Sequence, residues 1–496
     1  MLHVLNRAQK FMFPIRKEEL RKFLPMLALF FLISLVYNIL RSMKIALVIS
    51  APQSGAEIIP YLKVWGILPG ALLLTYIFTV LSRRLSREYV FYSMVSIFLS
   101  FFLIFACILY PFSSYLELSG LASYLSERLP KGAHGFVSMV RYWHFSLFYL
   151  FSELWGSVVL SMLFWGFVNE VTKMAEAERF YSVFSASGQL SCIAAGQLGL
   201  LFSFEKAKWD DSVHILLGLV LASGLGIIGL FFHLSRVFGP EVHEGAHTSE
   251  GATTKGKGRS QGFSLAESVY YVMHSRYLIY IVLMVVGYNL VFNLTDVLWT
   301  NQLGQRFHED PGAINLYMSK MTTAKGIVSA ISAVFLCGYV LRRFGWLAGA
   351  LVTPLIIFVT SIIFLPLTLS SQSSTLEALT LALHSPVSLA VFIGAIQNTL
   401  TRASKYTFFD ATKEMSFIPL SRSEQRKGKA VVDGISSRLG KSGGSLIYQC
   451  LLLLLTSISA ATPYIIGIVF ITLFLWIYAI FKLNKEMKPL RNPRHF

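Results

Sequence analysis

The sequence predicts an all-α integral membrane protein with twelve transmembrane helices arranged as two six-helix pseudo-repeats. Hydrophobic residues make up 54% of the 496 residues and charged residues only 14%, and the mean hydropathy is +0.60. A soluble protein of this length needs more charged surface. Apolar runs of about 20 residues, the length that crosses a bilayer, recur from Leu24 almost to the C-terminus. These observations together predict a polytopic membrane protein.

We expect the spans at twelve apolar runs, namely 24–48, 61–81, 89–112, 143–167, 184–204, 212–234, 277–299, 317–340, 347–369, 378–399, 439–459 and 462–481. Glycine and polar residues dilute the fifth and eleventh runs, which makes their assignment the weakest. The first run is too long for a signal-peptide core and no small-residue cleavage pattern follows it, so we expect it to remain as a helix.

Lysine and arginine are concentrated in segments that fall on one side of a twelve-span count. These segments are 7–22, 83–87, 342–343, 405–438 and 482–494. Because lysine and arginine accumulate in cytoplasmic loops, this distribution predicts that both termini are cytoplasmic. It also explains most of the net charge of +17, so nucleic acid is not an expected partner.

A polar stretch rich in glycine, serine and threonine, residues 239–262, lies midway along the chain and is typical of a flexible linker. We therefore expect an N-terminal half at 1–236, a cytoplasmic linker at 237–272 and a C-terminal half at 273–496. The halves resemble each other, because LVYNILRSMKIALV in the first run matches VGYNLVFNLTDVLW in the seventh. This match aligns Asn38 with Asn289. Many secondary transporters are paired repeats with the substrate site between them.

Six ionisable side chains are predicted to lie within the membrane or close to its surface: Arg41, Lys44, Glu153, Asp296, Lys325 and Lys441. A charge at mid-bilayer costs about 2.5–3.5 kcal/mol on insertion scales, so it is usually functional unless it reaches the interface. Long lysine and arginine side chains can reach it, whereas Glu153 is too short. Lys63 and Glu57 lie near the start of the second predicted span, and we interpret them as ordinary charges at the membrane interface. Cations outnumber anions, which favours an anionic, phosphate-bearing substrate, with Glu153 as a counter-ion.

The segment GISSRLGKS (434–442) resembles a phosphate-binding P-loop, but five residues instead of four separate its two glycines and no strand precedes it. We therefore do not expect an ATPase. The four cysteines and the histidines lack the spacing of metal ligands. Neither a metal nor a cofactor is expected.

Several stretches together resemble the bacterial and plastid-type ATP/ADP translocases, a family of nucleotide transporters. They are SELWGSVVLSMLFWGF (152–167), GAEIIPYLKVW (55–65), KEMSFIPL (413–420), KGKAVVD (427–433) and LGKSGGSLIYQ (439–449). The resemblance implies twelve helices in a major-facilitator-like arrangement, transport of nucleotides without hydrolysis, and the inner membrane of an intracellular bacterium. By motif, the family's charged transport residues fall on Lys44, Glu153, Asp296 and Lys441.

The chain departs from the ATP/ADP exchangers in two segments. LRSMKI (40–45) keeps Arg41 and Lys44 but lacks two aspartates, and TDVLWT (295–300) has Asp296 in place of glutamate and Thr300 in place of lysine. We therefore expect Asp296 to lack a cationic partner, which makes it the candidate for coupling to protons. This interpretation favours net proton-coupled nucleotide import over strict ATP/ADP counter-exchange.

Two other classes remain as alternatives. An ion or lipid channel or flippase predicts a continuous polar stripe through one half, whereas the charges here are divided between both halves. A membrane enzyme acting on nucleotides needs a carboxylate cluster for metal or a true P-loop.

Overall fold

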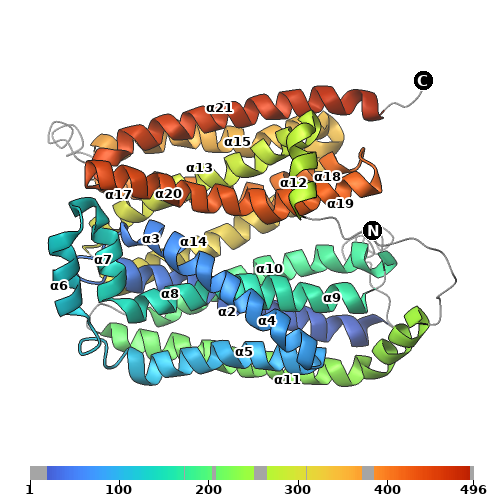
Figure 1. The fold of residues 1–496 in the computed structure, drawn as a ribbon, viewed down its shortest axis with the longest axis horizontal. Helices are drawn as coiled ribbons and strands as arrows, with labels where there is room; N and C mark the ends of the chain where they lie inside the picture. The colour runs from blue at the N-terminus through green and yellow to red at the C-terminus, as the bar shows by residue number, and fades with distance from the viewer. Residues whose placement is uncertain are drawn as a thin grey trace, which may run out of the picture.

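The chain folds into a bundle of long helices that lie along one axis (Figure 1). The computed structural model describes residues 19–491 apart from residues 173, 204–207, 251–264, 309 and 371–384. Every regular element in these described residues is helical, which confirms the all-α prediction. A helix pairs its own backbone N–H and C=O groups, and this is what a chain in hydrocarbon requires.

The helices of the first part of the chain are α2 Leu20–Ile49, α3 Ile58–Tyr61, α4 Leu68–Arg84, α5 Arg87–Ile104, α6 Ser119–Arg128, α7 His134–Arg141, α8 Trp143–Trp155, α9 Trp165–Val171, α10 Met174–Phe202 and α11 Trp209–Glu250. Those of the second part are α12 Leu265–His274, α13 Arg276–Arg306, α14 Pro311–Ile331, α15 Gly338–Ser370, α17 Pro386–Ser404, α18 Asp410–Phe417, α19 Arg422–Lys429, α20 Ser437–Leu455 and α21 Ile458–Arg491. Several are joined end to end through π-helical segments.

Eight helical stretches in the described part of the chain are long and apolar enough to cross a membrane. One of them, Pro311–Leu369, contains two of the predicted spans, and Gly345, with φ of +78°, breaks it between them. The predicted runs 184–204, 378–399 and 439–459 overlap α10, α17 and α20, which are helical but are not among the eight. The number twelve therefore stays a prediction.

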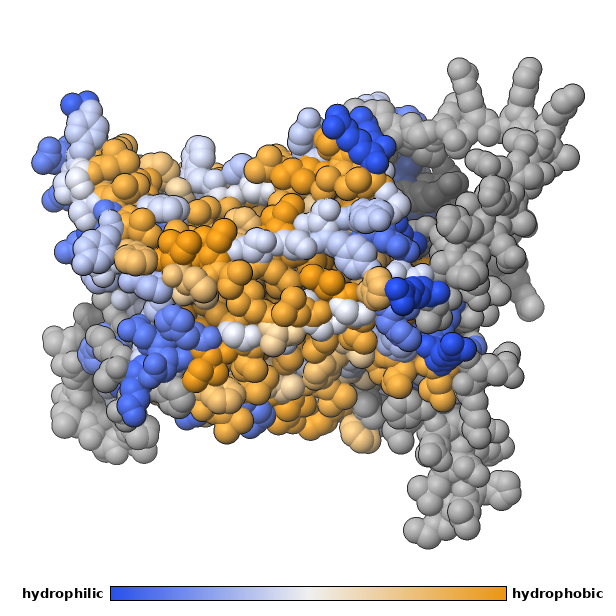
Figure 2. Space-filling view, turned by 90° about the horizontal axis from the view of Figure 1, so that it is seen from below, coloured by the Kyte–Doolittle hydropathy of each residue, from blue (hydrophilic) through white to orange (hydrophobic). Residues whose placement is uncertain are grey.

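The surface of the bundle carries an apolar belt between two hydrophilic ends (Figure 2). Large apolar side chains are freely exposed on the surface of the protein, for example Phe335 at 69% and Leu454 at 78%. Exposed apolar surface of this extent indicates a lipid-facing surface.

The helices pack as two groups, which appear as the lower and upper layers of Figure 1. In one group α2 contacts α8, α10 and α11, and in the other α13 contacts α17, α20 and α21. The predicted repeats and their boundaries go further than this grouping and stay predictions. In the predicted linker, α11 continues to Glu250 and α12 begins at Leu265, and residues 251–264 lie outside the described residues.

The two groups meet toward the end of the bundle that carries α6 and α7. There the Asn315 side chain donates to Ser203 Oγ at 2.7 Å and the Gln449 side chain donates to the carbonyl of Pro60 at 2.9 Å. Helices α10 and α14 approach so closely that a Cβ at Gly196 would lie 2.1 Å from Thr323 Oγ1. Small residues permit such close helix packing in membranes.

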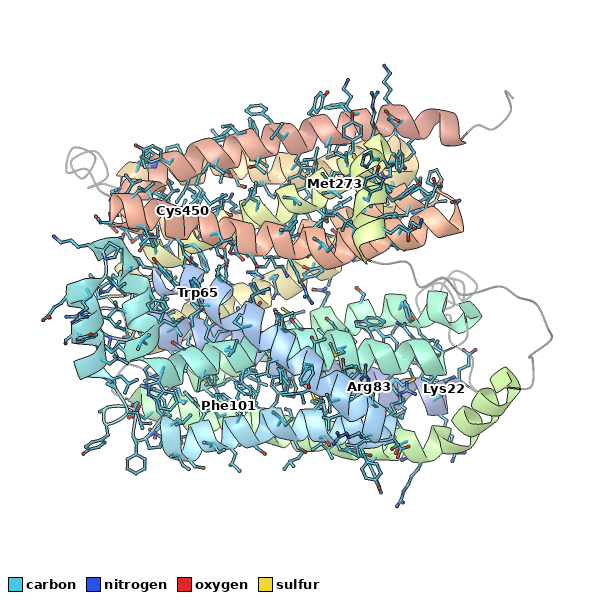
Figure 3. All side chains as sticks on the ribbon, viewed as in Figure 1. Lys22, Trp65, Arg83, Phe101, Met273 and Cys450 are labelled. Atoms are coloured by element: carbon cyan, nitrogen blue, oxygen red, sulfur yellow. The ribbon has the colours of Figure 1, made fainter. Side chains whose placement is uncertain are left out.

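The opposite end of the bundle carries Lys22, Arg83 and Met273, whereas Trp65 and Cys450 lie toward the α6–α7 end (Figure 3). Lys22 and Arg83 each belong to a cation-rich segment, and these two residues share one end, as the charge distribution requires. Which end faces the cytoplasm stays a prediction.

Cysteine labelling tests this orientation, with Cys107 and Cys450, the exposed native cysteines, first replaced by serine. Tyr115, which is 86% exposed, lies beyond one end of α5 and Arg83 lies before the other. We expect a membrane-impermeant maleimide to label Tyr115→Cys in intact cells and Arg83→Cys only after lysis. The reverse pattern would contradict cytoplasmic termini, and equal labelling of both in intact cells would contradict the span between them.

Candidate functional site

Lys44 of α2 and Glu153 of α8 form an ion pair in the middle of the first helix group, with Lys44 Nζ donating to Glu153 Oε2. The lysine side chain is 4% exposed and lies 4.5 Å from the centroid of the Tyr149 ring, whereas the glutamate is 34% exposed. Trp155 Nε1 donates to the carbonyl of Ile33 at 3.1 Å and so fixes α8 against α2. The carboxylate of the pair is therefore more accessible than its ammonium group.

Asp296 of α13 accepts hydrogen bonds from two side chains of α17. Asn398 Nδ2 donates to its Oδ1 at 2.8 Å, and Arg402 Nη2 donates to the same oxygen at 3.4 Å. The expectation that Asp296 lacks a cationic partner was therefore wrong. That expectation considered the lysine lost at position 300 but did not consider Arg402, which lies just beyond the predicted tenth span (378–399). In the structure α17 continues through Ser404 and brings Arg402 beside α13.

Lys441 lies near the start of α20, in the predicted motif LGKSGGSLIYQ, and its side chain is exposed. The glycines of this motif let α20 approach α13, because a Cβ at Gly440 would lie 2.6 Å from the Asn289 Cβ. Asn293 Nδ2 then donates to the carbonyl of Lys441 at 2.7 Å. The segment 434–442 is helical throughout, so its backbone N–H groups do not form a P-loop.

Lys63 belongs to the site, although the sequence indicated an ordinary interface charge. Its Nζ donates to Asn293 Oδ1 of the other helix group. It also interacts electrostatically with Asp296, Glu153, Lys44 and Lys441. Lys63 lies in a π-helical segment, Leu62–Ile67, which turns its side chain toward the second group instead of toward the membrane surface.

Two further π-helical segments adjoin site residues. Gly156–Phe164 begins three residues after Glu153, and Lys405–Phe409 begins three residues after Arg402. A π-turn inserts an extra residue into the helix and changes the direction of the side chains beyond it, and such turns are frequent at functional sites. No pattern in the sequence analysis predicted them.

Lys325 and Asn289, which were also predicted as site residues, are buried and bonded to polar groups of the helices. Lys325 is 9% exposed and its Nζ donates to Asn38 Oδ1 at 3.3 Å, which joins α14 to α2. Asn289 is 5% exposed and donates to the carbonyl of Val285 at 2.8 Å. Asn38 makes the same bond to the carbonyl four residues before it, also at 2.8 Å, and its alignment with Asn289 stays a prediction.

The structure thus gathers charges from both helix groups into one electrostatically coupled set, which we call the central cluster. Its cations are Arg41, Lys44, Lys63, Arg402 and Lys441, and its anions are Glu153 and Asp296. Arg41 of α2 interacts electrostatically with one carboxylate of each group, Glu153 and Asp296. Five cations face two carboxylates, so three positive charges are left over among the described members.

Comparisons with known proteins show which proteins the whole chain resembles. The profile of the TLC ATP/ADP transporter family matches residues 3–487. An "ADP,ATP carrier protein 2" from Chlamydia pneumoniae is 40% identical over 97% of this chain and 91% of its own length. An "ADP,ATP carrier protein 4" from Rickettsia bellii is 33% identical over 98% of this chain and 94% of its own. A chloroplastic "ADP,ATP carrier protein 1" from Arabidopsis thaliana is also 33% identical, over 97% and 76%.

Solved transporter structures share the fold at low sequence identity. A bacterial homologue of the iron transporter ferroportin, in an inward-facing state, has a TM-score of 0.56 at 14% identity and covers 93% of this chain and 98% of its own. The nucleoside transporter NupG has a TM-score of 0.53 at 12% identity, with coverage of 93% and 98%. These matches support the predicted major-facilitator-like arrangement.

The relatives are named as carriers and transporters, which confirms the prediction of a transporter rather than an ATPase. Their match over almost the whole length and the membrane-spanning helices make this an integral membrane protein. The chain belongs to the TLC ATP/ADP transporter family.

Proposed function

We propose that the chain carries nucleotides, ATP and ADP among them, across a bacterial inner membrane by alternating access between its two helix groups. The observation that carries this proposal is the central cluster with its three surplus positive charges. Several unneutralised charges are unfavourable inside a membrane. A di- or triphosphate chain provides the matching negative charge and accepts hydrogen bonds from lysine and arginine.

Site residues contributed by both groups support alternating access. Lys44 and Glu153 belong to the first group, and Asp296, Arg402 and Lys441 to the second. The groups are joined toward the α6–α7 end, by the contacts of Asn315 and Gln449. A substrate bound between the groups gains contacts from both, so its binding energy favours closure over it.

The charge balance of the cluster favours counter-exchange over proton-coupled import. The two carboxylates of the cluster are both paired with cations, Glu153 with Lys44 and Asp296 with Arg402. Neither is the unpaired carboxylate that the proton-coupling interpretation assumed. An empty site must reorient with three uncompensated positive charges, whereas a site that holds a nucleotide is close to neutral. We therefore propose that the carrier returns with a second nucleotide bound.

The proposal extends the function of the relatives named as ADP,ATP carriers to this chain. It places both termini in the cytoplasm and the surface of the bundle in contact with lipid. The channel or flippase alternative is less well supported, because the charges form a compact set between two groups rather than a stripe through one.

Transport into proteoliposomes tests the exchange mechanism. We expect labelled ATP to enter vesicles preloaded with ADP, and to enter empty vesicles at a rate lower by at least about tenfold, because the unloaded site reorients poorly. An imposed pH gradient should leave the exchange rate unchanged. Vesicles without the protein give the background rate.

Two outcomes of that experiment would decide against parts of the proposal. Uptake into empty vesicles that rises with an inward proton gradient would replace exchange by proton-coupled import. Failure of ATP, ADP and every other nucleotide tested to enter preloaded vesicles would refute nucleotide transport.

Glu153→Gln should lower the rate of ATP exchange by at least about tenfold while leaving membrane insertion intact. The substitution keeps the size of the side chain but removes the counter-ion of the buried Lys44, and a charged hydrogen bond is worth roughly 1.5–3 kcal/mol. Glu88→Gln is the matched control, because Glu88 is exposed at the start of α5. An exchange rate equal to that of the control, at equal amounts of protein in the membrane, would rule out the role of Glu153.

A further inference from the structure

Arg402 has a guanidinium group that is largely buried and held by its neighbours. Its side chain is 14% exposed and lies near the C-terminal end of α17, beside α13. Its Nε donates to Asn398 Oδ1 at 2.7 Å, and its Cζ lies 4.4 Å from the centroid of the Phe292 ring. These two contacts fix the plane and the direction of the guanidinium group.

The outer edge of the guanidinium group, which carries Nη1 and Nη2, is much less engaged. In the described part of the chain its hydrogen bond is the one from Nη2 to Asp296 Oδ1 at 3.4 Å, which is long for such a bond. The same oxygen accepts the shorter bond of 2.8 Å from Asn398. Asp296 is therefore held chiefly by the amide, and the two-nitrogen edge of Arg402 remains available to another acceptor.

Through Nη2 this edge contacts Asp296, a member of the central cluster. Asp296, its neighbour, interacts electrostatically with Arg41, Lys44 and Lys63 of the other helix group. The contact with Asp296 thus places Arg402 beside a carboxylate that interacts with cations of the first group.

The ion pairs of the two groups have opposite order along the chain. In the first group the cation, Lys44, precedes the carboxylate, Glu153, and in the second the carboxylate, Asp296, precedes the cation, Arg402. Each group therefore has one cation beside one carboxylate. The lysine is a point charge, whereas the arginine is a planar fork suited to two oxygens of one phosphate.

We infer that Arg402 is a substrate-binding residue that receives a phosphate group of the nucleotide on Nη1 and Nη2. Asp296 is its weak ligand in the empty site, and Asn398 is a positioning residue that orients both. The inference rests on the proposed function. It adds Arg402 as the residue by which the second helix group binds the phosphate chain. With Lys44 on the first group, the phosphate chain then bridges both groups.

A purely structural role for Arg402, as the counter-ion of Asp296, makes a different prediction. In that case Arg402→Gln weakens nucleotide binding only because Asp296 is left as an uncompensated negative charge beside the phosphates. Removing that charge as well, in Arg402→Gln/Asp296→Asn, should then restore the affinity. If Arg402 binds phosphate itself, the double substitution does not restore it.

The test is calorimetric titration of the purified, detergent-solubilised protein with ADP. We expect Arg402→Gln to raise the dissociation constant roughly 10- to 100-fold, and Arg402→Lys to give an intermediate value because it keeps the charge but loses the fork. The double variant should stay at least about tenfold weaker than Asp296→Asn alone. Arg83→Gln, an exposed arginine at one end of the bundle, should match the wild type.

The outcomes separate this inference from the proposed function. Wild-type protein that binds neither ADP nor ATP would overturn both. Wild-type protein that binds ADP, with Arg402→Gln binding equally well, would overturn the inference alone. Affinity of the double variant equal to that of Asp296→Asn would also overturn it, because Arg402 would then act only on Asp296. Unchanged thermal unfolding of the variants excludes loss of the fold as the cause of weaker binding.

Discussion

The ion pair between Lys44 and Glu153 is the interaction on which the architecture of the site depends. A lysine that is 4% exposed is costly inside a membrane unless a carboxylate and hydrogen-bonding groups surround it. Its partner lies on α8, so α2 and α8 must pack closely at this level, and the contact of Trp155 with the α2 backbone maintains that packing. The remaining charges are arranged around this pair, and their surplus calls for an anion.

The second helix group contains a similar ion pair between two helices, made by different residues. Asp296 and Arg402 connect α13 to α17 as Lys44 and Glu153 connect α2 to α8. Glycines in α20 bring Lys441 close to α13, and the π-helical segment around Lys63 turns a lysine of the first group onto the second. Both groups therefore contribute cations to the same space. A carrier that binds its substrate between two moving parts needs this distribution.

The sequence identifies candidate site residues where a single residue conflicts with its surroundings, and their role in transport stays a prediction. A charge such as Glu153, Lys44 or Asp296 within an apolar run is visible without a structure, and the structure gathers these residues with Arg41 and Lys441. Lys63 and Arg402 were missed because both lie near the ends of predicted spans, where a charge is unremarkable. Their roles depend on a π-turn and on the length of α17, and hydropathy does not report either.

The central claim is that an anionic nucleotide neutralises the central cluster and draws the two helix groups together. The most direct measurement is the distance between spin labels at Arg83 and Met273, which are exposed and lie at the same end of the bundle on different groups. The account predicts that ADP shifts the distance distribution to shorter values and that adenosine, which lacks phosphate, does not. An unchanged distribution with ADP, or an equal shift with adenosine, would contradict it.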